Sequence, residues 1–505
     1  MIPYKKSTCN TRENYDPRKE LAGYEFPSID LLDGPSPEFS SEYIIETRSQ
    51  IIETFRENGT EIISIDIAAG YTNTLYEVVP QKGFRIARIK QLQAELSFVL
   101  KTNNVSISPI FEKGAIGIIV HNKNPAILPI KSIIDSDEFV NSTPRFELPM
   151  IIGRTLTHDN VIIDLTERRH ILVSGATGQG KSVLLSTMIT SLLYKKHPSE
   201  LKLVLVDPGG LELNMFSGLR NHFLATYPDS DSVIVTDATE ANMIFQSLTV
   251  EMKDRFRLLQ NAHVRTLKEY NSKFRERKLN PSVGHYFMPY LVVIVDRFSD
   301  LEGSMDEKYL KELVDMGHTI GIHLIVSMQR PSHDILPSNI KSNIPTRVAF
   351  RTTSRQESRL ILDKEGAEKL AGNGDAIYKD ELLEIRLQVP YISTSELNKI
   401  VLHIGGQPGY DHAYPLPESI LSLTVIPVDL DDRDALFEEA ARLIVIHQQG
   451  STSLIQRKFS IGYNRAGMIM DQLEAAGIVG LTQGAKPRDI FIADEYSLEK
   501  LLRNL

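Results

Sequence analysis

The chain of 505 residues contains a single cysteine, Cys9, and no tryptophan. One cysteine cannot form an internal disulfide, and it excludes a zinc site built from several cysteines. A lone thiol fits a reducing compartment, and we expect the protein to act in the cytoplasm. Long apolar runs are also lacking. Because no run reaches roughly 18 residues, the sequence predicts neither a membrane span nor a secretory signal.

A strong excess of positive charge is missing as well. Lysine and arginine total 56 against 65 aspartates and glutamates, which gives a formal net charge of -9. Any surface that binds nucleic acid must therefore be local. The hydrophobic fraction of 42% and the charged fraction of 24% are ordinary for a soluble globular protein, so a chain disordered throughout is excluded. The length predicts about three domains.

Composition and periodicity divide the chain into five segments. We expect a polar leader or linker with little core over 1–42, a small α+β domain over 43–146, a strand-and-helix domain over 147–415, a linker rich in proline and aspartate over 416–433, and a compact unit over 434–505. In the third segment, near-continuous apolar runs at 170–174, 201–206, 290–295 and 321–326 alternate with helical patterns such as 239–273. This alternation predicts an α/β fold with a parallel sheet covered on both faces.

A glycine-rich turn follows the first of these strands and precedes a helix. Its residues are Gly175, Ala176, Thr177, Gly178, Gln179, Gly180, Lys181 and Ser182. In such a turn, backbone N–H groups cradle phosphate oxygens, the lysine reaches the β- and γ-phosphates, and the serine hydroxyl ligates Mg²⁺. The pattern predicts a site for ATP and Mg²⁺. The alternative, a chance glycine-rich turn, fits poorly with the flanking strand and helix.

Polar residues end two further strands. Asp296 follows the apolar strand 290–295, where a carboxylate holds the Mg²⁺ shell in nucleotide-binding sheets; the alternative is an aspartate that only caps the next turn. Gln329 follows the strand 321–326 and is predicted to sense the γ-phosphate, or else to belong to a simple polar turn. The pair Asp207-Pro208, after the strand 201–206, has the same ambiguity. The predicted catalytic residues are Lys181, Asp296 and Gln329.

Several stretches together resemble the FtsK/SpoIIIE-type bacterial DNA translocases. They are 175–183, 207–213, 264–271, 329–332 and 358–363, within a resemblance that extends from 43 to 492. The resemblance implies a RecA-like motor that works as a homo-hexameric ring around double-stranded DNA in chromosome segregation or DNA transfer, with a second ring formed by 43–146. A mixed ring is the alternative to the homo-hexamer. The resemblance also implies Arg359 as the arginine that reaches a neighbour's γ-phosphate, with Arg347 and Arg355 as alternatives. The membrane helices usual in the family are not encoded, so the chain is similar to the soluble translocase part alone, of a Bacteroidetes-like kind.

The last segment shows the pattern of a winged helix. A helix, a turn, a second helix opened by residues 463–465 and a basic hairpin follow one another, a plan in which the second helix suits the major groove. It resembles the family's γ domain. The candidate DNA-binding residues are Arg457, Asn464, Arg465, Lys486 and Arg488. The alternative is a winged helix that docks a protein.

Four motif positions depart from the family pattern. Ser327-Met328 replaces an Ala-Thr pair before Gln329, and His318 stands where arginine is usual. Arg297 stands where the family has the glutamate after the Mg²⁺-binding aspartate, and Gly209 stands where it usually has lysine. Because arginine stays charged and cannot accept a proton, the sequence predicts ordinary ATP binding with slow hydrolysis. Two alternatives to the translocase follow: a DNA-binding paralogue that binds nucleotide without hydrolysing it, and a secretion or conjugation ATPase that acts on protein. The winged helix counts against the second.

Overall fold

The structure is a computed structural model, and its description covers most of the chain. The described residues are 14–34, 41–82, 84–85, 88–102, 105–143, 145–228, 230, 232–301, 306–332, 338–418, 433–459, 461, 463–480, 488, 490–492 and 494–502. They fall into two compact units, Met1–Glu418 and Ser419–Leu505. None of the helices in this described part combines the length and the apolar character needed to cross a bilayer.

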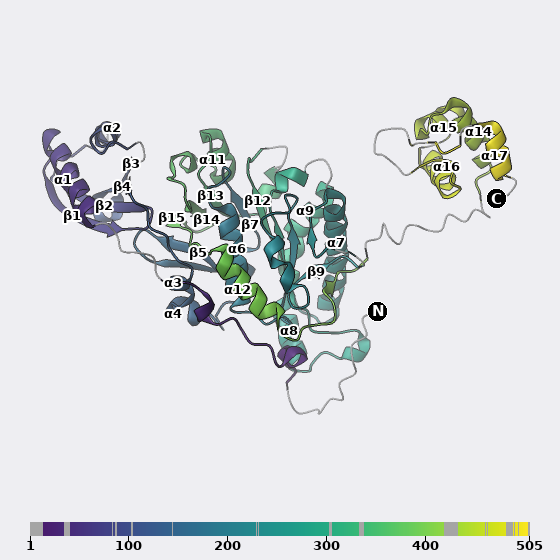
Figure 1. The fold of residues 1–505 in the computed structure, drawn as a ribbon, viewed down its shortest axis with the longest axis horizontal. Helices are drawn as coiled ribbons and strands as arrows, with labels where there is room; N and C mark the ends of the chain where they lie inside the picture. The colour runs from purple at the N-terminus through teal and green to yellow at the C-terminus, as the bar shows by residue number, and fades with distance from the viewer. Residues whose placement is uncertain are drawn as a thin grey trace. The chain divides into compact units, whose positions relative to one another are not determined.

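A ten-stranded sheet forms the centre of the first unit (Figure 1). Its order is β10-β8-β11-β12-β7-β13-β14-β15-β5-β6. The strands are β5 (Pro149–Thr155), β6 (Asn160–Asp164), β7 (Ile171–Ser174), β8 (Leu201–Val206), β10 (Ile234–Val235), β11 (Tyr290–Val295), β12 (Ile322–Met328), β13 (Thr346–Phe350), β14 (Asp375–Lys379) and β15 (Glu384–Gln388). The six strands from β10 to β13 pair in parallel and the rest antiparallel. Every residue of β8, β11 and β12 is buried, as the apolar runs predict.

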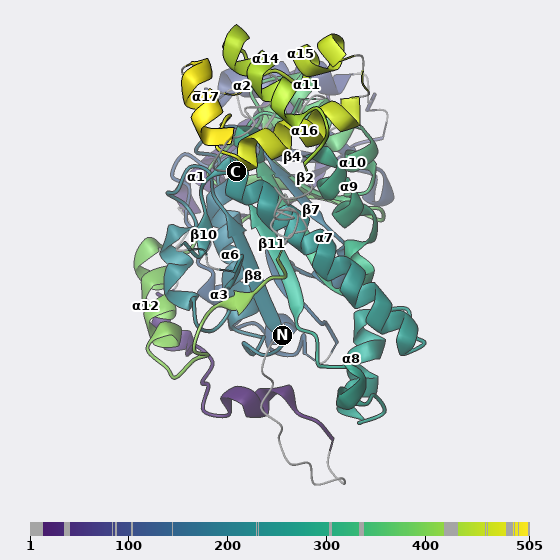
Figure 2. The ribbon, with the colours of Figure 1, turned by 90° about the vertical axis from the view of Figure 1, so that its right-hand side faces the viewer.

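Helices pack along this sheet and complete its core. They are α3 (Lys131–Ile134), α4 (Asp137–Val140), α5 (Leu165–Arg168), α6 (Lys181–Leu193), α7 (Ala238–Asn261), α8 (Leu267–Arg275), α9 (Glu307–Met316), α10 (Ser338–Ser342), α11 (Arg355–Leu362) and α12 (Thr394–Gly405). Figure 2 shows α7 running beside β8 and β11 and leading into α8. The single helix expected over 239–273 is broken, because His263 adopts a positive φ of 51° and the Thr266 side chain caps a new helix. A short parallel pair, β9 (Ala225–Thr226) and β16 (Tyr414–Pro415), joins distant segments.

A smaller antiparallel sheet stands near the start of the chain. Its order is β1-β2-β4-β3, with β1 (Ile62–Ala69), β2 (Asn73–Pro80), β3 (Val105–Ile110) and β4 (Ala115–His121). Helices α1 (Ser41–Glu57) and α2 (Ile89–Val99) complete this module. Phe55 of α1, Leu96 of α2, and Tyr76 and Ile118 of the sheet are all fully buried in one cluster. The module has both the helices and the strands that the sequence predicts for an α+β domain in this region.

Residues 14–34 differ from the expectation of a leader with little core. Arg18 forms an ion pair with Glu200 at 3.2 Å, and the Tyr24 ring meets the His197 ring edge-on with centroids 5.2 Å apart. The Leu32 side chain is 2% exposed in the core of the large sheet domain. These single anchoring contacts follow no helical or strand period, which is why the sequence pattern does not predict them.

The second unit is a small bundle of helices. It contains α14 (Phe437–His447), α15 (Thr452–Phe459), α16 (Tyr463–Ala475) and α17 (Glu495–Leu502). Isolated β-bridges join Gly450 to Arg488 and Val479 to Ile490. Ile455 of α15 and Ile469 of α16 pack in its own apolar core. Two consecutive helices with short extended segments beside them give the winged-helix plan predicted from sequence, with α16 beginning at Tyr463.

Candidate nucleotide site

The phosphate-binding turn lies between β7, which ends at Ser174, and α6, which begins at Lys181. Gly175 has a φ of 156°, and a Cβ there would stand 2.6 Å from the Phe350 Cβ. Gly180 has a φ of 120° and lies against both Phe350 and Gly374. Side chains at these two positions are excluded by backbone conformation and by space. The turn is therefore fixed with its backbone open toward the start of α6, where N–H groups and the helix dipole favour phosphate.

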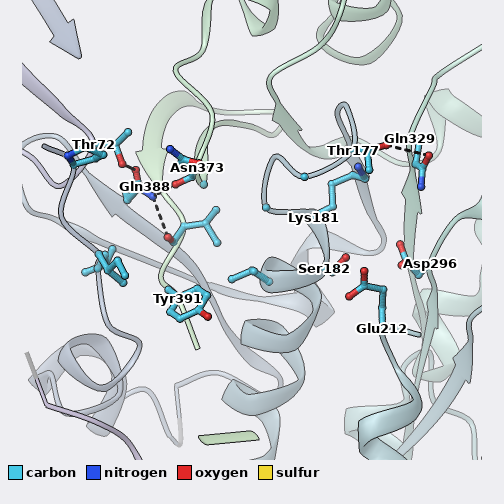
Figure 3. Close-up of a pocket in the computed structure, with 18 of the residues that line it drawn as sticks. Thr72, Thr177, Lys181, Ser182, Glu212, Asp296, Gln329, Asn373, Gln388 and Tyr391 are labelled. Carbon is cyan, nitrogen blue, oxygen red and sulfur yellow. Dashed lines mark hydrogen bonds between the residues drawn. The ribbon is translucent and has the colours of Figure 1, made fainter. Parts of the chain in front are cut away.

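A cavity of about 570 Å³ opens beside this turn (Figure 3). Four charged residues line it: Lys181, Glu212, Asp296 and Arg297. Thr177, Ser182 and Gln329 add polar groups to the same wall. The structure thus brings the predicted Lys181, Ser182, Asp296 and Gln329 into one site, although they come from three different strand ends. The remaining residues of the turn form its backbone: Gly175, Ala176, Gly178, Gln179 and Gly180.

The Lys181 ammonium is the central cation of the cavity. Its Nζ donates hydrogen bonds to the carbonyls of Gly175 at 2.7 Å and Ala176 at 2.9 Å. Burial lowers the pKa of Lys181; Asp296 and Glu212 act against this shift, whereas Arg297 adds to it. A phosphate group would compete for the ammonium as a charged acceptor and would favour its protonated form.

Ser182 and Asp296 provide oxygen atoms on the same side of the turn. Asp296 follows β11, and its side chain is almost completely buried. Figure 3 shows the Ser182 hydroxyl and the Asp296 carboxylate facing the same space. A hydroxyl and a carboxylate are hard ligands of the kind that Mg²⁺ takes next to phosphate oxygens. These residues fit a nucleotide-bound Mg²⁺, which would neutralise phosphate charge when bound.

Gln329 follows β12, the strand between β7 and β11. The Thr177 hydroxyl donates a hydrogen bond of 3.3 Å to the Gln329 side-chain oxygen. This bond leaves the amide N–H groups of Gln329 beside the phosphate-binding turn, as Figure 3 shows. The prediction of a γ-phosphate sensor fits this placement.

Arg297 is held in an unusual conformation next to Asp296. Its φ is +48°, a left-handed value that is uncommon for residues other than glycine. The guanidinium turns toward the loop after β8: a Cβ on Gly209 would stand 2.9 Å from its Nη1. The residue that departs from the family pattern at 297 therefore contacts the one that departs at 209.

Glu212 is a residue of this site that sequence reasoning missed. It lies in the loop after β8, and Figure 3 shows its carboxylate pointing toward Ser182 and Asp296. Asp207, which is fully buried, accepts hydrogen bonds from the backbone N–H groups of Gly209, Glu212 and Leu213 at 2.9 to 3.1 Å. The sequence feature that could have pointed to Glu212 is its position five residues after Asp207, the aspartate that follows β8.

The far end of the cavity is less polar. Figure 3 shows Tyr391, Asn373 and Gln388 at this end, and the apolar Ile127 and Val183 also line the cavity. Figure 3 shows Tyr391 on the opposite side of the phosphate-binding turn from Asp296. A planar ring with a few amides beside it suits a nucleotide base. No local motif marks these residues, because 127 and 391 meet only through the fold.

The candidate arginines for a neighbour's γ-phosphate lie away from this cavity. Arg359 is on α11, with a 63% exposed side chain and an ion pair of 2.6 Å to Glu365. Arg355, on the same helix, lies 3.9 Å from Glu365. Arg347 is buried and bonded to the Ile361 carbonyl and to Asp363. Arg359 is thus placed to reach another molecule more readily than Arg347.

The predicted DNA-binding residues of the second unit divide into three groups. Arg457 is exposed on α15. Arg465 makes two hydrogen bonds of 2.9 Å to Asp434, and the largely buried Arg488 forms an ion pair with Glu474. The Asn464 side chain and all of Lys486 lie outside the described residues. These ion pairs give Arg465 and Arg488 a structural role that the sequence pattern did not predict.

Comparisons with known proteins match three parts of the chain to models of one family. The FtsK alpha domain matches residues 26–122, the FtsK/SpoIIIE family model 129–333, and the Ftsk gamma domain 431–493. The chain is 39% identical over 499 residues to the DNA translocase FtsK of Chlorobaculum tepidum, which covers 95% of this chain and 61% of that protein. It is 34% identical to the DNA translocase SpoIIIE of Bacillus subtilis, covering 94% of this chain and 60% of that protein.

The chain thus spans about three fifths of the length of these curated relatives. Among solved structures, the pCW3 conjugation coupling protein TcpA is 23% identical with a TM-score of 0.47, covering 70% of this chain and 99% of that one. So distant a likeness carries no statement about function. The FtsK/SpoIIIE match spans the phosphate-binding turn, β11 and β12, and the Ftsk gamma match spans the winged helix. The chain belongs to the FtsK/SpoIIIE family.

Proposed function

We propose that the chain is an ATP-dependent double-stranded DNA translocase that acts in chromosome segregation or DNA transfer. The observation that carries this proposal is the cavity in which Lys181, Ser182, Asp296 and Gln329 surround one phosphate-binding turn. Nucleoside triphosphate hydrolysis uses these groups: a lysine of the phosphate-binding turn, a hydroxyl, a strand-end carboxylate and an amide. Family membership supplies duplex DNA as the substrate.

The active form in this proposal is a homo-hexameric ring in the cytoplasm, with ATP and Mg²⁺ at each site. Arg359 of one protomer supplies a positive charge to the γ-phosphate held by its neighbour, for which its exposure on α11 is suited. The second unit contacts DNA through α15 and α16, where Arg457 is exposed. Phosphate contacts from such a unit add local affinity to a chain of net negative charge.

Steady-state ATP turnover with and without long linear duplex DNA tests the proposal. We expect turnover to rise when duplex is added, and the rise to depend on duplex length, because a longer track allows more steps per encounter. Single-stranded DNA of the same mass is the control. Turnover that is equal with duplex, with single strands and without DNA would contradict the proposal.

A further inference from the structure

We propose that Glu212 is the catalytic carboxylate that holds the water attacking the γ-phosphate. This inference rests on the proposed ATPase function and names a residue that was not among the predicted catalytic residues. The position after Asp296 is the one from which the sequence argument expects such a carboxylate, and it holds Arg297 instead. The carboxylate is instead supplied by the neighbouring strand of the sheet.

The placement of Glu212 follows from the loop that carries it. Strand β8 is hydrogen-bonded to β11 in parallel, with Val206 opposite Val295, so the residues after both strands emerge at the same sheet edge. The buried Asp207 carboxylate fixes the following loop through Gly209, Glu212 and Leu213. A loop tied at three N–H groups by one buried acid holds Glu212 in place without using the Glu212 carboxylate itself.

Few carboxylates in the cavity could hold the attacking water. Among the described residues that line it, only Asp296 and Glu212 are acidic. Asp296, directly after β11, is placed with Ser182 to serve Mg²⁺. Glu212 faces the same space from the adjacent loop and is half-buried, so its carboxylate reaches a water that the cavity shields in part. Arg297 cannot take this role, because a guanidinium has no acceptor.

In the reaction, the water oxygen forms a bond to the γ-phosphorus while the bond from that phosphorus to the bridging oxygen breaks. The electron pair of the broken bond stays with ADP. Glu212 accepts the hydrogen bond of the water, takes the proton that the water loses, and returns it to solvent as phosphate leaves. Lys181, which lines the same cavity, supplies positive charge to the phosphate.

The test compares Glu212→Gln with the wild-type full chain and with Asp300→Asn. Glutamine keeps the size of the side chain but cannot accept the proton, so we expect DNA-stimulated turnover to fall about 10²–10⁴-fold with unchanged ATP affinity. Asp300 is an exposed acid just beyond β11 that does not line the cavity, and its change should leave turnover at the wild-type value. Glu212→Gln turnover within about threefold of wild type would overturn the role of Glu212.

A second variant separates chemistry from damage to the fold. The double variant combines Glu212→Gln with Arg297→Glu, so that a carboxylate enters the cavity from the residue after Asp296. Its turnover should be at least about tenfold higher than that of Glu212→Gln alone. A misfolded single variant could not be rescued in this way, and lack of rescue in a folded double variant counts against the water-holding role. If the wild-type chain binds ATP but does not hydrolyse it, both the proposed function and the role of Glu212 fail. If the wild type and Glu212→Gln hydrolyse ATP equally fast, only the role of Glu212 fails.

Discussion

The guanidinium of Arg297 occupies the space that a side chain at Gly209 would fill, with Nη1, Cζ and Nε all within 3.1 Å of a Cβ built there. They are two of the motif positions at which the resemblance to the family implies another residue, lysine at 209 and glutamate at 297. The Arg297 guanidinium thus places a positive charge beside the loop after β8, where the resemblance implies a lysine. The two departures form one structural exchange.

The exchange predicts energetic coupling between the two positions. Gly209→Lys places a second cation against Arg297 and should lower the melting temperature, whereas Gly209→Lys with Arg297→Glu should regain most of that loss. Residues in contact typically couple by about 0.5–3 kcal/mol. Melting temperatures of the wild type, both single variants and the double variant measure the coupling. Additive shifts would show that the two positions are independent.

Arg297→Glu alone distinguishes two accounts of hydrolysis. If the chain lacked a carboxylate for the water, the new glutamate should raise turnover at least about tenfold. With Glu212 already in that role, we expect a change of less than about threefold. Steady-state turnover on saturating ATP and duplex DNA measures the difference. A rise of tenfold or more would support the slow hydrolysis predicted from sequence and contradict the Glu212 assignment.

Lys181→Ala should weaken ATP binding about 10- to 100-fold, because a charge-assisted contact to phosphate is lost. Exposed Lys308, in the first turn of α9, offers a matched control, and Lys308→Ala should bind ATP like the wild type. Titration with a fluorescent ATP analogue gives both affinities. DNA binding without nucleotide should be the same in all three proteins. Equal ATP affinity in Lys181→Ala would remove Lys181 from the site.

The ion pair between Arg465 and Asp434 predicts an effect on DNA affinity. Asp434→Asn weakens the hold on Arg465 and should tighten DNA binding at low salt. Arg465→Ala should weaken binding to the preferred sequence by roughly 5- to 150-fold and relax sequence preference. Arg442→Ala is the control, since Arg442 is another arginine of this unit held in ion pairs, with Glu438 and Glu499. Identical DNA affinity in Arg465→Ala and Arg442→Ala would make Arg465 purely structural.

Buried histidines predict a loss of stability in acid. Burial lowers the pKa of His323 to about 4 and holds the pKa of His170 well below its ordinary value of 6.5, while half-buried His318 and the Arg169 charge lie close by. The folded state favours the neutral rings, so the unfolded state binds more protons between pH 6.5 and 4. Stability is complete above pH 6.5 and falls as the pH drops below it.

Thermal melts of the full chain between pH 7.5 and pH 5 measure this loss. His323→Gln should flatten the pH dependence of the melting temperature, and the exposed His158→Gln should leave it unchanged. The slope is the decisive quantity, because replacing a buried side chain lowers the melting temperature at every pH. The same slope in His323→Gln and in the wild type would contradict the assignment.

Much of the fold could be predicted because its signals are local. The apolar runs of β8, β11 and β12 are continuous, and the phosphate-binding turn is a short motif between a strand and a helix. Asp296 and Gln329 could be placed because the carboxyl ends of parallel strands share one edge. The α+β module was predicted in the same way, from short apolar stretches with clear turns between them.

The remaining features depend on contacts between distant residues. Glu212 enters the cavity only because the Asp207 side chain shapes the loop between them. Tyr391 and Ile127 line the same cavity although they are far apart in the sequence. Packing of residues 14–34 relies on separate anchors such as Leu32, which have no period. Side-chain hydrogen bonds and long-range packing of this kind leave no repeating pattern in a single sequence.

Displacement of a third strand from a linear duplex measures the movement of the protein along DNA. A labelled oligonucleotide is annealed as a triplex near one end of a long duplex, and its release is followed after ATP is added. We predict rapid release by the wild type, no release without ATP, and none by Lys181→Ala. Release that is equally fast with Lys181→Ala, or no release by a wild-type chain that hydrolyses ATP on the same DNA, would contradict a translocase.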